Sequence, residues 1–100
     1  MTEQDPVLLT NAQLAAAPAS ERVRLVESYL LASIGALKPE AVETIDASHR
    51  LADLGIDSLQ VVELKFGLDQ VLGRELEVEL IISNPTVGEL AAQSLRAAGL

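Results

Sequence analysis

The chain has 100 residues, contains no cysteine and carries a formal net charge of -8. This length predicts a single domain with one core, and the lack of cysteine excludes a disulfide framework or a thiolate zinc site built from the chain itself. The acidic charge disfavours nucleic acid and anionic membrane surfaces as partners and favours basic protein surfaces, although it also serves solubility. Without an apolar run long enough to span a membrane and without a signal-peptide pattern, the chain is expected to be cytoplasmic and free of membranes.

Residues 1–17 are expected to be a flexible leader, in which Asn11 caps a short turn through Leu14. An amphipathic helix is predicted from Ser20 to Leu37, after Pro18, because apolar residues recur there at three- and four-residue intervals. These residues are Val23, Val26, Leu30, Ile34 and Leu37.

A long polar connection is predicted to follow this helix, from Lys38 to Ala52. A few apolar residues are expected to hold it against the core, namely Val42, Ile45 and Leu51. Connections of this length in a compact domain are usually functional or tightly packed.

The second main helix is predicted from Ser58 to Leu72. Asp57 is a good N-cap, Gln60 stands where a capping-box side chain reaches back, and Gly73 ends the helix. A third main helix is predicted after Thr86, with Glu89 as the reciprocal capping partner. The alternating segment Glu75–Leu80 has no strand to pair with, so we expect an extended loop and a short helical turn around 80–83.

The second helix is predicted to carry two apolar stripes on opposite sides. At about 100° per residue, the larger and wholly aliphatic stripe is the expected core face. It contains Val61, Leu64, Leu68, Val71 and Leu72. The other stripe, Leu59, Val62 and Phe66, is either covered by the long loop or left exposed for a partner.

Ser58 directly follows Asp57, a pair that raises the question of serine catalysis. A catalytic serine needs a general base within hydrogen-bond reach, and His49 is the only histidine in the chain. Adjacent residues at a helix start project in different directions, so a triad of Ser58, His49 and Asp57 is disfavoured. A metal site and a glycine-rich phosphate loop are disfavoured by the same scarcity of suitable residues. Ser58 is therefore either an ordinary first-turn residue or an accessible hydroxyl where an attached phosphate would be stabilised.

The ordered motifs resemble those of the acyl carrier proteins over most of the chain, from about residue 20 onward. They are LGIDSL at 54–59, VEL at 62–64, NPTV at 84–87 and ELA at 89–91. The resemblance implies an all-α bundle of three main helices plus one short helix, with a long loop between the first and second main helices. The carrier domain is then expected at 18–98, with 99–100 as a C-terminal tail.

The resemblance also implies a function without catalysis. A phosphopantetheinyl transferase would attach 4′-phosphopantetheine from coenzyme A to Ser58, and the thiol of this arm would carry acyl groups as thioesters. The implied partner-recognition residues are Asp57, Leu59, Val62, Glu63 and Phe66. The expected partners are ketosynthase, acyltransferase and other synthase domains, and the isolated domain is expected to be monomeric.

The leader most resembles that of polyketide synthase carrier domains. Phe66, Lys65 and the long connection depart from the common patterns, so the pathway is less specified than the carrier role. A fatty-acid carrier, a peptidyl carrier and an unmodified helical protein-interaction module remain the alternatives.

Overall fold

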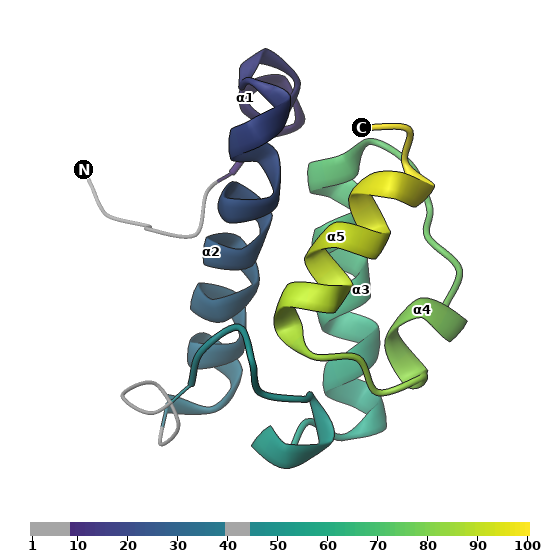
Figure 1. Ribbon diagram of the computed structural model, residues 1–100. Helices are drawn as coiled ribbons and strands as arrows, with labels where there is room; N and C mark the ends of the chain where they lie inside the picture. Colours follow the sequence, from purple (N-terminus) through teal and green to yellow (C-terminus); the bar gives the residue numbers. More distant parts are fainter. Residues whose placement is uncertain (1–8, 40–44) are drawn as a thin grey trace, which may run out of the picture.

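The computed structural model describes residues 9–39 and 45–100. The elements in chain order are α1 (Asn11–Ala16), α2 (Ala19–Leu37), the 3-10 turn η2 (Ala52–Leu54), α3 (Ser58–Leu72), α4 (Glu79–Ile82) and α5 (Val87–Ala97). Three long helices lie along one another, α4 lies beside α3 and α5, and α1 sits at one end of the bundle (Figure 1). The predicted all-α bundle of three main helices and one short helix is confirmed. Within the described residues no helix is long and apolar enough to cross a membrane.

The core is aliphatic and is built from every helix. From α2 it takes Val26, Leu30 and Ile34, each fully buried and spaced four residues apart, which is one face of an α-helix. The other buried apolar residues are Leu14, Leu51, Leu64, Leu68, Val71, Leu72, Leu76, Ile81, Val87, Leu90, Ala91 and Leu95. Full burial of a leucine or isoleucine side chain stabilises a fold by about 1.5–3 kcal/mol, so this set is what holds the short chain together.

Helix α1 differs from the flexible leader expected for residues 1–17. Its N-cap is Thr10, which forms a reciprocal capping box with Gln13, and Asn11 instead donates a side-chain hydrogen bond to the Val71 carbonyl of α3, 3.0 Å away. Leu14 is completely buried. The helix forms because this leucine joins the core; residues 1–8 of the expected leader lie outside the described part of the chain.

Arg22 of α2 connects α1 to the C-terminus of the chain. Its guanidinium donates to the carbonyls of Leu14, Ala15 and Ala17 at distances of 3.0–3.2 Å, and to the carbonyl of Leu100 at 3.3 Å. The last carbonyls of a helix have no partners inside it, and a guanidinium offers five donors. Residues 99–100, expected as a tail, are thus attached to the bundle.

The connection before α3 is held against the start of α5. Leu51 is buried, as predicted, and Ile45 packs against the core, whereas Val42 lies outside the described residues. The main-chain N–H groups of Val87 and Gly88 donate to the carbonyls of His49 and Ala47, both at 2.9 Å. The first N–H groups of α5, which lack partners inside the helix, are satisfied by this loop.

Leu14→Ala is expected to lower the free energy of unfolding by about 2–5 kcal/mol, because it leaves a cavity under α1. Urea denaturation followed by circular dichroism measures this loss. Leu59→Ala, the same change at a side chain that is 70% exposed, should change stability by no more than about 0.5 kcal/mol. Equal effects of the two substitutions would show that α1 does not contribute to the core.

Candidate functional site

Ser58 is the first residue of α3 and is exposed. Gly55 enters this region with a φ of 75°, a left-handed conformation that glycine adopts at little cost. Asp57 then acts as N-cap: its carboxylate accepts the N–H of Gln60 at 2.8 Å, and the Gln60 side chain accepts the N–H of Asp57 at 3.1 Å. This capping box, predicted from the sequence, fixes the backbone at the start of α3, from which the Ser58 side chain projects.

The start of α3 favours a negatively charged group on Ser58. Asp57 satisfies the N–H of Gln60, so the N–H groups of Ser58 and Leu59 remain as donors at the positive end of a 15-residue helix. A phosphate ester on the Ser58 hydroxyl would lie at these donors. The residues present therefore fit a phosphodiester-linked group.

The side chains of His49 and Asp57, the two candidate partners of Ser58 in a catalytic triad, are engaged elsewhere. The ring of His49 has its Nδ1 3.1 Å from an Asp46 carboxylate oxygen, and the Asp57 carboxylate is used in capping its own helix. Hydrogen bonds from the side chain and main chain of Ser48, followed by His49, lower the pKa of Asp46. Among residues 9–39 and 45–100, no three histidine, aspartate or glutamate side chains group to hold a metal ion.

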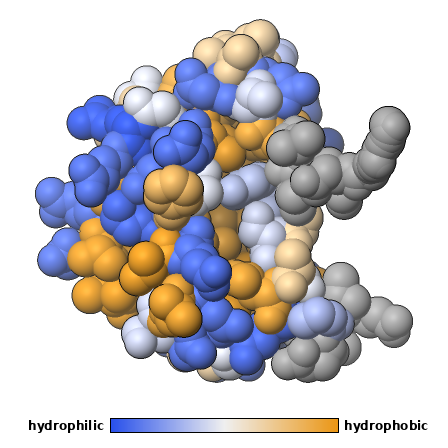
Figure 2. Space-filling model, turned by 180° about the vertical axis from the view of Figure 1, so that it is seen from behind, coloured by the Kyte–Doolittle hydropathy of each residue, from blue (hydrophilic) through white to orange (hydrophobic). Residues whose placement is uncertain are grey.

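Helix α3 separates its two apolar stripes as predicted. Leu64, Leu68, Val71 and Leu72 are buried, and Val61 is half-buried against the core. On the other side, Leu59, Val62 and Phe66 are 70%, 56% and 67% exposed. The view from behind shows hydrophobic surface in several places, most of it across the lower half of the molecule, with hydrophilic surface between (Figure 2). Leu59, Val62 and Phe66, called here the α3 strip, are spaced at three and four residues and so form one continuous line.

The charges beside the α3 strip are mostly negative. Glu63 is exposed on the same helix. Lys65, the one cation within α3, has its ammonium 2.7 Å from the Asp69 carboxylate and 3.8 Å from that of Glu75. The hydrogen bond to Asp69 raises the pKa of Lys65. Because Lys65 is already paired, it offers little free positive charge to a partner.

Two exposed apolar residues near α4 were not predicted from the sequence. Ile82 is 61% exposed and Val78, the residue before α4, is 37% exposed, while neighbouring Ile81 is buried. Helices α3 and α4 contact one another. The adjacent isoleucines Ile81 and Ile82 were a usable signal, because consecutive residues of a helix point about 100° apart and a helix with one core-facing side tends to expose one of them.

A small helical bundle with an exposed, capped serine and an adjacent apolar strip has the features of a carrier domain. The phosphopantetheine attachment site family matches residues 28–93. The chain is 34% identical over 87 residues to the pikromycin polyketide synthase component PikAII of Streptomyces venezuelae; the match covers 83% of this chain and 2% of that protein. A solved structure, the A1-type ACP domain from module 5 of MLSA1, matches with a TM-score of 0.72 and 28% identity, covering 88% of this chain and 89% of that one.

The chain belongs to the phosphopantetheine attachment site family. Domains of this family are acyl carriers rather than catalysts, and they hold a covalently attached 4′-phosphopantetheine. The carrier role expected from the resemblance is thereby confirmed.

Asp57→Ala is expected to lower the free energy of unfolding by about 0.5–2 kcal/mol, because the N–H of Gln60 loses its capping acceptor. Asp57→Asn keeps a capping oxygen and should stay within a few tenths of a kcal/mol of the original chain, roughly the spread among good N-caps. Thermal and urea unfolding of both variants test this. A loss with Asp57→Asn as large as with Asp57→Ala would mean that the negative charge, and not the cap, is what matters.

Proposed function

We propose that Ser58 is the residue to which 4′-phosphopantetheine is attached. The observation that carries this proposal is the exposed hydroxyl at the first position of α3, beside two main-chain N–H groups without helix partners. When attached, the arm supplies a terminal thiol on which acyl groups are held as thioesters. The chain has no cysteine, so the carrier thiol comes with the arm.

The α3 strip is proposed to be the surface that partner enzymes bind. Leu59, Val62 and Phe66 provide apolar contact area next to Ser58, and Asp57 and Glu63 provide negative charge at its border. Exposed apolar residues in a line, bordered by charge, are typical of protein-binding sites. Asp57 would in addition contact the phosphopantetheinyl transferase from its place beside Ser58.

The proposed pathway is polyketide biosynthesis. Similarity to a polyketide synthase component and to a carrier domain of module 5 of MLSA1 supports it over a fatty-acid or peptidyl carrier. The chain spans about 2% of the length of the curated relative. The proposed partners are a phosphopantetheinyl transferase and the ketosynthase, acyltransferase and other domains of a synthase. The isolated domain is proposed to be a monomer and to act in the cytoplasm.

Incubation with coenzyme A, Mg²⁺ and a broad-specificity phosphopantetheinyl transferase is expected to add one phosphopantetheinyl group to the folded chain in place of the hydroxyl proton, with release of adenosine 3′,5′-bisphosphate, and to raise its mass accordingly. Ser58→Ala should abolish the gain, because it removes the hydroxyl proposed to attack, and intact-mass spectrometry measures both outcomes. The proposal is wrong if the original chain gains no mass or if the gain survives in Ser58→Ala.

Val62→Asp and Phe66→Asp are each expected to lower kcat/KM by about tenfold or more, for a partner ketosynthase acting on the acyl-loaded carrier or for an acyltransferase acting on the carrier with a free thiol. Loss of one well-packed apolar contact at an interface commonly has this size. Helicity and melting temperature should stay near those of the original chain, because both side chains are exposed.

Val23→Asp is the matched control for these variants, since Val23 is an exposed valine on α2. It should leave partner turnover unchanged. Unfolding of Val62→Asp or Phe66→Asp would place those residues in the core, and equal impairment by Val23→Asp would remove the special role of the α3 strip.

A further inference from the structure

Asn84 has a backbone conformation that sets it apart from the other described residues. Its φ is 63°, and within 9–39 and 45–100 it is the sole residue other than glycine with a positive φ. Asparagine tolerates this conformation better than most residues, but the conformation still has a cost. A conformation of this kind persists only where surrounding contacts favour it.

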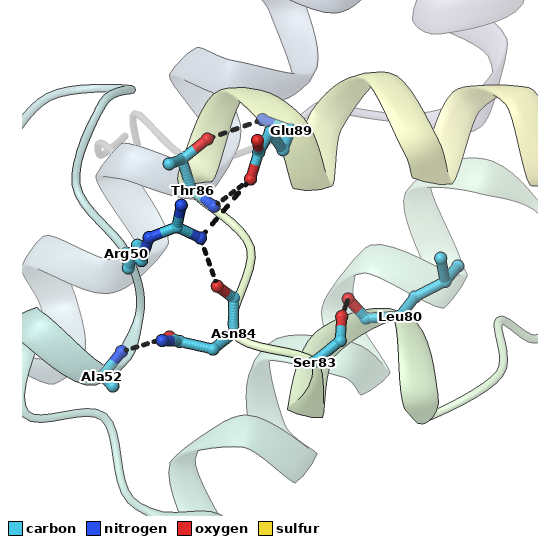
Figure 3. Close-up of polar contacts among 7 residues, drawn as sticks. All are labelled: Arg50, Ala52, Leu80, Ser83, Asn84, Thr86 and Glu89. Carbon is cyan, nitrogen blue, oxygen red and sulfur yellow. Dashed lines mark hydrogen bonds and ion pairs between the residues drawn. The ribbon is translucent and has the colours of Figure 1, made fainter.

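Those contacts reach back to the connection that leads into α3. The Asn84 side-chain oxygen accepts the main-chain N–H of Ala52 at 3.1 Å, and the Asn84 carbonyl accepts the guanidinium of Arg50 at 2.8 Å. Figure 3 shows the side chain and the carbonyl of Asn84 both directed to this segment. We call these two hydrogen bonds the Asn84 clasp.

The clasp is itself supported by the start of α5. Arg50 lies 3.7 Å from the Glu89 carboxylate, and that carboxylate also accepts the N–H of Thr86 in the capping box of α5 (Figure 3). Arg50 and Thr86 additionally form an isolated antiparallel bridge. Arg50 is therefore positioned by Glu89 and by Thr86 as well as by its hydrogen bond to Asn84.

Ala52 is the first residue of η2, so its N–H has no partner inside that turn. Asn84 supplies the missing acceptor from a distant part of the chain. The turn continues through hydrogen bonds from Leu54 and Ile56 to the Leu51 carbonyl, and the next residue is the N-cap Asp57. Successive hydrogen bonds along residues 51–57 thus connect the clasp to the residue before Ser58.

We propose that Asn84 is a positioning residue that fixes the segment 52–57 and so holds Ser58 in the orientation that a phosphopantetheinyl transferase requires. This inference rests on the proposed attachment at Ser58. In this proposal, the connection between α4 and α5 affects the rate of modification by positioning Ser58, and it does not contact the reacting atoms.

Three substitutions at Asn84 separate the backbone conformation from the hydrogen bond. Asn84→Gly keeps the positive φ without strain but removes the acceptor for Ala52. Asn84→Asp keeps both an acceptor and tolerance of the conformation, whereas Asn84→Ala loses both. Because Asn84→Ala is also strained and is the variant most prone to misfold, the comparison of glycine with aspartate decides the question.

For each folded variant, we would measure kcat/KM for the addition of phosphopantetheine by intact mass, and hydrogen exchange at the Ala52 amide. Asn84→Gly should slow the modification by about three- to tenfold, the ratio that corresponds to loss of one ordinary hydrogen bond. Exchange at Ala52 should accelerate in the same variant. Asn84→Asp should restore both quantities toward those of the original chain.

Thr10→Ala is the structural control. It removes the side-chain cap of α1, where the Thr10 hydroxyl accepts the N–H of Gln13 at 3.1 Å, and it touches neither Asn84 nor the residues that support it. It should lower stability while the modification rate stays unchanged.

The inference is overturned if Asn84→Gly is modified at the original rate, or if Asn84→Asp is as slow as Asn84→Gly. A slow Thr10→Ala would also overturn it, because general destabilisation would then explain the effect. If the unsubstituted chain is not modified at Ser58, the proposed function fails and this inference fails with it. The intact-mass assay of the unsubstituted chain distinguishes this outcome from a failure of the Asn84 inference alone.

Discussion

Burial of one side of α3 is the constraint on which the rest of the molecule depends. Leu64 and Leu68 are almost completely removed from solvent and contribute to the aliphatic core shared with α2 and α5. With about 100° between successive residues, burial of that side directs Leu59, Val62 and Phe66 outward. The same rotation leaves Ser58 exposed at the helix start. The proposed attachment point and the proposed recognition strip are thus consequences of core packing on the opposite side of one helix.

Charged side chains of α3 also connect this helix to the loop that follows it. The Lys65 and Asp69 side chains are both mostly shielded from solvent and contact one another, and Asp69 also accepts the N–H of Leu76 from the following loop at 2.9 Å. The cation that the sequence places beside the strip is thereby used to hold α3 to the chain that follows it. If partners bind the strip as proposed, they would meet the exposed residues Asp57 and Glu63, whose negative charge favours a basic surface on the partner.

Features that depend on neighbouring residues were predictable from the sequence. The capping boxes of α3 and α5 involve residues three positions apart, and the stripes of α3 follow from helical periodicity alone. The start of α1 was misplaced because Thr10 and Asn11 are both good N-caps. The side chain of Asn11 instead donates a hydrogen bond to the carbonyl of Val71, a residue that is distant in the sequence. The contact of Asn84 with Ala52 escaped prediction for the same reason, as did the exposure of Ile82, which depends on which face of a four-residue helix meets its neighbours.

The bonds that Arg22 makes join two parts of the molecule that are distant in the sequence. Arg22 connects the end of α1 to Leu100. Both lie at the end of the bundle opposite the start of α3 (Figure 1). A partner that reaches Ser58 would therefore approach from a side of the molecule that neither α1 nor Leu100 occupies.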